Sequence, residues 1–340
     1  MHRARRPHGG RTSRRYAAEH HTVCPGPAAR PMTPSARVEE TRFRGAPAVE
    51  LAAGELTATF LPRLGMTGVS LRLRGVDYLA LPGGLEALRA GRTLGLPLLA
   101  PWANRLADRQ YRAAGVAVDL RGIPLTTDDH GLPIHGFLVG ARGWSVDRRS
   151  VRRGVARVGA SIEVDARAFP FRHRIELAVR LDESRLRIDT TVVATGSRPV
   201  PVALGWHPYL RLPDRARSRW RLRLPARTRL VLDDRGIPTG ESVPAPAEND
   251  EIGRRTLDDL SELGRGRRLA LEADDGSAIE LKCGANFPFA QVWVPRARPF
   301  AALEPMTAPT NALETGSTPL VPTGESLTAR FSLVPTGRDG

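Results

Sequence analysis

The sequence predicts an all-β fold, a sandwich or a barrel of many short strands, and two observations lead to that prediction. Segments in which apolar and polar residues alternate recur along the chain, which is the two-residue period of a strand with one buried face. Glycine and proline are abundant, with 33 Gly and 29 Pro in 340 residues, as expected for short strands joined by tight turns. Hydrophobic residues make up 41% of the chain, so a large core can form.

The alternating segments predict strands from near Val38 to the C-terminal region. They lie at residues 48–52, 56–61, 175–181, 186–190, 220–224, 269–271, 279–281, 289–294 and 327–333. Turns are expected at Gly45 and Gly54, because glycine suits tight backbone conformations. Turns at residues 182–184 and at Asp-Gly 275–276 join consecutive strands, which predicts two β-hairpins. The segment 289–294 is apolar at most positions, which predicts a strand buried on both faces.

Helical periodicity is confined to residues 84–90 and 257–263, and a short helix is predicted for each. No internal repeat or linker interrupts residues 38–338, so one domain is predicted there. Residues 1–37 are predicted to be a disordered basic tail, since the first 31 hold seven Arg and one Glu. That segment has no apolar core of a secretory signal peptide.

The composition disfavours several classes of protein. The net charge is +15, but the arginines are spread among acidic residues rather than gathered with aromatics, so no nucleic-acid partner is predicted. No apolar run approaches the length of a membrane span, so no membrane partner is predicted. The two cysteines, Cys24 and Cys283, are far apart and form neither a disulfide framework nor a zinc pattern. A cytoplasmic location is therefore expected.

Two histidines outside the tail lie in apolar surroundings. His135 lies in the segment Leu-Pro-Ile-His-Gly-Phe, and His207 lies in Trp-His-Pro-Tyr-Leu. Such surroundings predict partial burial, which can move the pKa of an imidazole across neutrality and suit it to acid–base chemistry. Each histidine also fits a hydrogen-bonded core residue, and the local pattern leaves both interpretations open.

A carboxylate and an arginine occupy comparable positions. Glu304 ends an apolar stretch and precedes a proline, where burial of a carboxylate is costly unless the group is paired or used. An ion pair with one of the many arginines is the alternative. Asn104 and Arg105 follow an apolar run, so Arg105 either binds an oxygen-rich ligand or lies at a solvated strand end.

The sequence lacks the motifs of several other chemistries. It has no G-x-S-x-G elbow, no P-loop, no dinucleotide-binding glycine pattern and no H-E-x-x-H motif. His130 and His135 lie five residues apart without a third ligand nearby, so no metal is predicted. Aromatic residues lie near the polar candidates in the sequence: Trp206, Tyr209, Phe287, Phe289 and Trp293. Aromatic faces beside a few polar groups suit a sugar, whose C–H face stacks on a ring.

Six segments share one further property. In chain order they are residues 101–106 (PWANRL), 134–136 (IHG), 206–210 (WHPYL), 237–241 (IPTGE), 257–259 (LDD) and 303–312 (LEPMTAPTNA). Together they resemble the aldose 1-epimerase, or galactose mutarotase-like, family, and most of all its bacterial branch. The resemblance runs from about residue 40 to 335, and the segments with His207 and Glu304 are the most specific.

The resemblance implies a large antiparallel β-sandwich of the galactose mutarotase type, a supersandwich with few short helices. It implies that Glu304 is the general base for the anomeric hydroxyl and that His207 is the general acid for the ring oxygen. The ring opens, the aldehyde rotates about C1–C2, and the ring recloses on the other face without a cofactor. We expect the two groups on opposite sides of the C1–O5 unit. A raised pKa for Glu304 and a pKa near the free value of about 6.5 for His207 would suit the reaction.

The residues expected to bind the sugar are Asn104, Arg105, His135, Asp258 and Trp293. The resemblance implies that Arg105 and His135 bind and polarise the substrate, and that Asp258 is the family's substrate-binding aspartate. Asp259 is a rival for that place. The aromatic pattern suggests Trp293 or Phe289 as the stacking face.

The sequence thus predicts an isomerase that interconverts the anomers of a small-molecule sugar such as glucose or galactose, as a monomer or homodimer. A hexose 6-phosphate and an unusual sugar acted on by the same two groups are alternative substrates. A carbohydrate-binding domain without catalysis is the alternative from another class. The presence of both Glu304 and His207 disfavours it, because a binding module needs neither an acid nor a base.

Overall fold

The computed structural model describes residues 36–213 and 215–337. The predicted disordered tail, residues 1–37, therefore lies almost wholly outside the described residues. Within the described part of the chain, no helix is long and apolar enough to cross a membrane.

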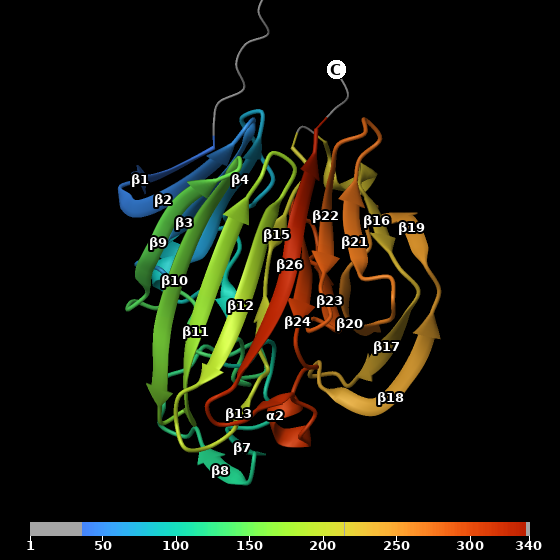
Figure 1. Cartoon of the computed structure of the whole chain (residues 1–340). Helices are drawn as coiled ribbons and strands as arrows, with labels where there is room; N and C mark the ends of the chain where they lie inside the picture. The colour runs from blue at the N-terminus through green and yellow to red at the C-terminus, as the bar shows by residue number, and fades with distance from the viewer. Residues whose placement is uncertain (1–35, 214, 338–340) are drawn as a thin grey trace, which may run out of the picture. The chain divides into compact units, whose positions relative to one another are not determined.

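Three larger antiparallel sheets form most of the described structure (Figure 1). The five-stranded sheet runs β1 (Arg37–Phe43), β2 (Ala46–Ala53), β3 (Leu56–Leu61), β4 (Thr67–Leu73), β5 (Val76–Asp77). The nine-stranded sheet runs β19 (Glu248–Glu251), β16 (Arg221–Leu224), β21 (Arg268–Glu272), β22 (Ala278–Cys283), β26 (Ser326–Thr336), β12 (Leu186–Ala194), β11 (Phe169–Leu181), β10 (Val155–Ala166), β9 (Ser145–Arg152).

The third sheet supplies several strands around the candidate site. It runs β18 (Pro238–Ala245), β17 (Arg227–Leu232), β20 (Leu257–Leu263), β23 (Phe289–Val294), β24 (Ala301–Met306), β14 (Gly205–Trp206), β6 (Leu98–Leu99), with β15 (Tyr209–Leu210) also paired to β24. Two small pairs join β7 (Gln110–Ala113) to β8 (Val116–Asp119) and β13 (Val200–Pro201) to β25 (Leu320–Val321). The helices are α1 (Gly84–Arg89), α2 (Ala312–Thr315) and a 3-10 turn at Arg217–Arg219.

The predicted all-β sandwich is confirmed. Eight of the nine segments predicted as strands lie within a strand, and the ninth, 220–224, begins one residue before β16. Both predicted hairpins form, as β11–β12 and β21–β22. The strand predicted to be buried on both faces is β23, an interior strand in which only Phe289 and Trp293 are half-exposed. The helix predicted at residues 84–90 is α1.

One predicted element is wrong. Residues 257–263 are not a helix but the strand β20, which pairs with β17 on one side and β23 on the other. The leucines at 257, 260 and 263 have helical spacing, but a helix here would leave the edges of β17 and β23 without hydrogen-bond partners. Backbone hydrogen bonding to β17 and β23 therefore outweighs the helical spacing of the leucines.

The sheets pack face to face across a continuous apolar core. Strands β2 and β3 contact β10 and β11, so the five-stranded sheet covers one end of the nine-stranded sheet (Figure 1). At the third sheet, Trp206 packs on Phe331 of β26 with ring centroids 5.6 Å apart, and its Nε1 donates to Thr190 of β12 at 3.0 Å. Trp206 is fully buried. Its contacts join the third sheet, just before His207 in the chain, to the nine-stranded sheet.

Coil segments fill the space beside this sheet and interlock through their backbones. Gly136 forms a bridge with Ala100, and Arg105 forms one with Ile134. The approach at Gly136 is so close that a Cβ there would lie 2.2 Å from the Ala100 carbonyl oxygen. Its φ of 64° also lies in the left-handed region that favours glycine. Glycine is required at this position on both counts.

We expect Gly136→Ala to lower the free energy of unfolding by about 3 kcal/mol or more, because a methyl group there must push the two segments apart. Gly45→Ala is the matched control. Gly45 has a φ of 82° but open space around its Cβ position, so only the backbone strain of about 1–2 kcal/mol applies. Urea denaturation of both variants separates the two costs, and equal losses would show that the close contact at Gly136 is not needed.

Candidate active site

All seven residues predicted for the site line one cavity of about 660 Å³. They are Asn104, Arg105, His135, His207, Asp258, Trp293 and Glu304. Two coil segments supply the first three, and the third sheet with its connections supplies the others. Segments spread over two hundred residues of sequence therefore meet at one place, and they leave room for a ligand of the size of a sugar.

Strand register brings the sheet residues together. In the antiparallel pair β23–β24, Gln291 lies opposite Glu304, and Asp258 of β20 lies opposite Trp293. The strands β14 and β15 both pair with β24, through Gly205 with Met306 and Tyr209 with Ala302. Continuing that register places His207, between β14 and β15, opposite Glu304.

The side chains of His207 and Glu304 are in direct contact. Nε2 of His207 lies 3.3 Å from Oε1 of Glu304. The two residues are only 5% and 2% exposed, so each is the other's main polar neighbour in a place with little water. The two groups form one adjacent pair, and their placement on opposite sides of the C1–O5 unit of a sugar stays a prediction.

Burial decides the protonation of this pair. It raises the pKa of Glu304 well above its ordinary value, and the nearby Asp258 carboxylate raises it further while Arg105 lowers it. Burial lowers the pKa of His207 to about 3, so the expectation of a value near 6.5 is wrong. The reason is that a buried imidazolium loses its hydration. Burial therefore favours the uncharged form of each group, which is the protonated carboxyl of Glu304 and the neutral imidazole of His207.

His135 and Asn104 hold each other in an unusual backbone geometry. Both have positive φ angles, 64° and 58°, which are costly for residues other than glycine and persist where contacts enforce them. The backbone N–H of Asn104 donates to Nδ1 of His135 at 3.2 Å, and the N–H of His135 donates to the Asn104 carbonyl at 2.9 Å. Burial lowers the pKa of His135 well below its ordinary value, with His207 and Arg105 adding to the effect. The ring is neutral with its proton on Nε2, and it is a hydrogen-bond donor.

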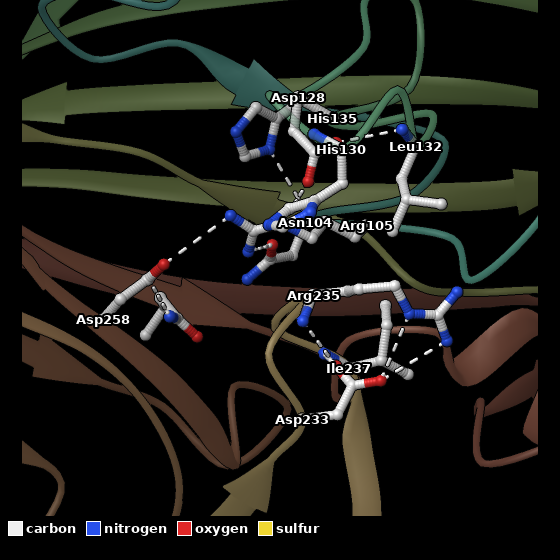
Figure 2. Close-up of polar contacts among 11 residues, drawn as sticks. Asn104, Arg105, Asp128, His130, Leu132, His135, Asp233, Arg235, Ile237 and Asp258 are labelled. Atoms are coloured by element: carbon white, nitrogen blue, oxygen red, sulfur yellow. Dashed lines mark hydrogen bonds and ion pairs between the residues drawn. The ribbon is translucent and has the colours of Figure 1, made fainter.

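Arg105 lies in a set of oxygen acceptors (Figure 2). Its Nε donates to Oδ2 of Asp128 at 2.7 Å, and Nη1 donates to Oδ1 of Asn104 at 3.1 Å. Nη2 lies 3.6 Å from Oδ2 of Asp258. These contacts fix the orientation of the guanidinium. The side chain of Arg105 is only 17% exposed, so Arg105 does not lie at a solvated strand end.

Asp128 is a residue of the site that sequence reasoning missed. Its Oδ1 accepts from the backbone N–H groups of His130 and Leu132, which closes a tight turn, and its Oδ2 faces Arg105 (Figure 2). Burial alone would raise the pKa of Asp128, but these hydrogen bonds and the Arg105 charge outweigh it and lower that pKa. The turn-forming Asp-Asp-His-Gly sequence was its only local signal.

A second turn closes over Arg105. Asp233 Oδ1 accepts from the backbone N–H groups of Arg235 and Ile237, at 3.0 and 2.8 Å (Figure 2). Gly236, inside this turn, has a φ of 74°, and a Cβ there would lie 2.9 Å from Nη1 of Arg105. The glycine therefore lets the turn lie flat on the guanidinium, just before the segment 237–241.

The structure separates the two candidate aspartates. Asp258 lines the cavity, and its Oδ1 accepts from Nε2 of Gln291 at 2.5 Å. Asp259 does not line the cavity, and its carboxylate lies 3.8 Å from Arg229. Gln291 was not predicted, although it is the polar residue between two aromatics on β23. Among the described residues, Oε1 of Gln291 and Oε2 of Glu304 are buried acceptors without partners, which suits a ligand that brings hydroxyl donors.

Aromatic side chains form one wall of the cavity. Tyr209 stacks on His207, with ring centroids 4.5 Å apart and planes 13° from parallel, and its hydroxyl lies 2.6 Å from that of Thr93. Trp293 meets both rings edge-on and lines the cavity. Phe289, the alternative stacking residue, is not among the lining residues. Trp293 is therefore the available aromatic face.

The metal-binding potential of the described residues is low. Residues 36–213 and 215–337 contain no group of three His, Cys, Asp or Glu side chains placed to hold a metal ion. Several polar groups of the cavity hydrogen-bond one another. Their remaining donors and acceptors suit an oxygen-rich ligand.

Comparison with known proteins gives the family of this chain. The family model "Aldose 1-epimerase" matches residues 47–333. The chain belongs to the aldose 1-epimerase family. The family and the fold support a carbohydrate epimerase activity. No curated protein matches the chain at a significant level.

Several solved structures have this fold. A galactose mutarotase-like protein from Clostridium acetobutylicum superposes with a TM-score of 0.79 at 20% identity, over 89% of this chain and 99% of that one. A putative aldose 1-epimerase from Escherichia coli K12 gives 0.69 at 19% identity, over 84% and 98%. Galactose 1-epimerase from Lactobacillus acidophilus gives 0.70 at 15% identity, over 88% and 98%. At such identities the likeness shows the shared fold alone.

The low pKa of His207 predicts a loss of stability in acid. The folded pKa of about 3 lies below the unfolded value of about 6.5. The imidazole of His207 therefore binds a proton in the unfolded chain but not in the folded protein, so the contribution of His207 to stability falls as the pH drops from about 6.5 toward 3. We expect His207→Asn to remove up to about 1.4 kcal/mol per pH unit of that slope. Chemical denaturation of both proteins between these pH values measures it, and parallel curves would contradict the assignment.

Proposed function

We propose that this protein is an aldose 1-epimerase that interconverts the α and β anomers of a free hexose. The observation that carries the proposal is the buried contact of 3.3 Å between His207 and Glu304 in a sugar-sized cavity. Family membership supports the reaction class. A pair of groups that can accept and donate protons in a site with little water is what ring opening and closure require.

The adjacency of the pair fits the reaction. The anomeric oxygen O1 and the ring oxygen O5 are bonded to the same carbon, C1, so two groups in contact can reach both. The carboxylate of Glu304 takes the proton of O1–H, the electron pair forms the C1=O1 double bond, and the C1–O5 bond breaks. O5 takes the proton from His207. Rotation about C1–C2 and the reverse proton transfers then close the ring on the other face.

The proton balance follows from the burial of the pair. In this mechanism the pair must hold one proton, on Glu304 or on His207, and the two forms differ by one transfer along the 3.3 Å contact. Burial favours the form with neutral imidazole and protonated carboxyl. The form that reacts, imidazolium beside carboxylate, is reached by moving that proton, and sugar hydroxyls hydrogen-bonded to the pair would stabilise its charges.

Substrate binding is assigned to the polar groups around the pair. Arg105 is oriented by Asp128 and Asn104 and would donate to sugar oxygens. His135 would donate through Nε2, and Asp258 would accept from a hydroxyl. Trp293 would stack on the C–H face of the ring. The cytoplasmic location and the reaction without a metal or cofactor remain predictions.

One observation favours a hexose 6-phosphate as the second candidate substrate. Arg92 lines the same cavity, and no carboxylate of the described residues lies within ion-pair distance of its guanidinium. An arginine without an acidic partner at a sugar site is suited to a phosphate. The anomer exchange itself would be unchanged.

We expect Glu304→Gln to lower the rate of mutarotation by about 10²–10⁴-fold, because the amide cannot accept the O1 proton. Polarimetry of freshly dissolved α-D-glucose and α-D-galactose measures the approach to anomeric equilibrium. Glu262→Gln, the same change at an exposed position on β20, is the control and should keep the wild-type rate. Near-normal turnover by Glu304→Gln would rule out Glu304 as the base, and no acceleration by the wild-type protein would rule out both free hexoses.

We expect Asp128→Asn to raise KM and to lower kcat/KM by about tenfold, as for the loss of one charge-assisted hydrogen bond. The amide keeps an oxygen for the turn at His130 and Leu132 but turns a donor toward Arg105. Asp165→Asn is the matched control, because it makes the same change at an exposed position of β10 that does not line the cavity. Steady-state kinetics on both variants give the comparison. If Asp128→Asn matched wild type, orientation of Arg105 by Asp128 would be unnecessary.

A further inference from the structure

A second cavity of about 720 Å³ has a strongly basic lining. Four arginines line it, and the lining includes no acidic residue. The lining residues are Arg217, Ser218, Gly253, Arg254, Thr256, Arg296, Ala297, Arg298 and Pro299. They come from three separate segments of the chain, and none of them lines the cavity that holds His207 and Glu304. The charge of this cavity therefore comes from the tertiary fold, not from one basic run.

The four arginines differ from their neighbours in having no acidic partner within residues 36–213 and 215–337. Among the described residues, no carboxylate lies within 4.0 Å of any of the four guanidinium groups. The next arginines along the chain are paired, since Arg255 lies 3.5 Å from Glu248 and Arg219 contacts Asp274. Carboxylates thus neutralise the surroundings of the cavity but not its lining. Arg254, Arg296 and Arg298 are exposed, so solvent ions screen part of the charge, but the four arginines together still give the cavity a positive potential that attracts anions.

Arg217 is already held in place by the backbone. Its Nη2 donates to the Arg255 carbonyl at 2.7 Å, and Nη1 donates to the Gly253 carbonyl at 3.3 Å. Its Nε is buried and has no partner among the described residues. Neutral carbonyls orient this guanidinium without cancelling its charge, which leaves a fixed positive group at the cavity wall.

We propose that this cavity binds a small molecule carrying two or more phosphoryl groups. The planar guanidinium donates two parallel hydrogen bonds to phosphate oxygens, which makes arginine the preferred residue for such groups. Ser218 and Thr256 add hydroxyl donors. Four arginines exceed what a single phosphate needs, and the volume is that of a metabolite site. The ligand class is therefore an organic bisphosphate or a short polyphosphate.

The cavity lies close to elements of the proposed sugar site. Thr256 immediately precedes β20 and is two residues before Asp258. Arg296 and Arg298 lie in the loop between β23 and β24, the strands that carry Trp293 and Glu304. A ligand bound here would contact the loop without entering the sugar site, so its binding is independent of the proposed epimerase reaction.

The test is isothermal titration calorimetry of the full-length chain with pyrophosphate, tripolyphosphate and fructose 1,6-bisphosphate. Inorganic sulfate serves as the comparison anion. We expect at least one phosphate probe to bind more tightly than sulfate. The double variant Arg296→Gln with Arg298→Gln changes two exposed loop residues and should weaken that binding by at least tenfold. The relative affinities of the probes distinguish an inorganic polyphosphate from an organic bisphosphate.

The matched control is Arg152→Gln with Arg265→Gln. It removes the same charge from exposed arginines outside the cavity and should change the affinity less than twofold. An equal loss of affinity in both double variants would show that only the overall charge of the protein matters, and it would overturn the proposal. Displacement of the probe by excess galactose would place the phosphate in the sugar site and also overturn it. Absence of binding by all three phosphate probes would do the same, whatever the mutarotation rate.

Discussion

The close contact between Gly136 and the carbonyl of Ala100 determines how the rest of the site is arranged. It allows two coil segments to lie side by side, and the reciprocal hydrogen bonds of Asn104 and His135 continue that contact. A third segment joins them at Asn311, whose backbone N–H donates to the Arg105 carbonyl and whose Oδ1 accepts from Ala107. Arg105 and His135 are thereby held by backbone rather than by flexible side chains. Such support keeps binding groups in position before a ligand arrives.

The second requirement of the site is burial. The aromatic wall of Tyr209 and Trp293 keeps water from His207 and Glu304, so both groups favour their uncharged forms. A solvated pair would separate into stable ions and would lose the capacity to exchange one proton easily. The same burial costs stability, since an unpaired charge at this depth is expensive. Burial therefore reduces the contribution of His207 to stability in acid, and it leaves a pair of groups between which a proton can move.

The two cavities show how one arginine-rich composition has two different outcomes. In the first, Arg105 is surrounded by Asp128, Asp258 and the Asn104 amide, so its charge is largely balanced and its donors are oriented. In the second, four arginines meet without a carboxylate among the described residues. Composition alone does not distinguish these situations, because it counts arginines without showing which carboxylates the fold brings beside them.

The sequence by itself determined the fold class, because period-two alternation, hairpin turns and abundant glycine are local properties. Distinctive flanking residues also made His207 and Glu304 candidates, and the structure brings these two side chains into contact. It did not reveal β9, an exposed edge strand with few apolar residues, and it misassigned residues 257–263, whose pairing partners lie on distant strands. Asp128 and Gln291, the choice of Asp258 over Asp259, and the low pKa of His207 were decided only by the tertiary structure. Each depends on distances and burial created when remote segments pack together, and no local pattern encodes them.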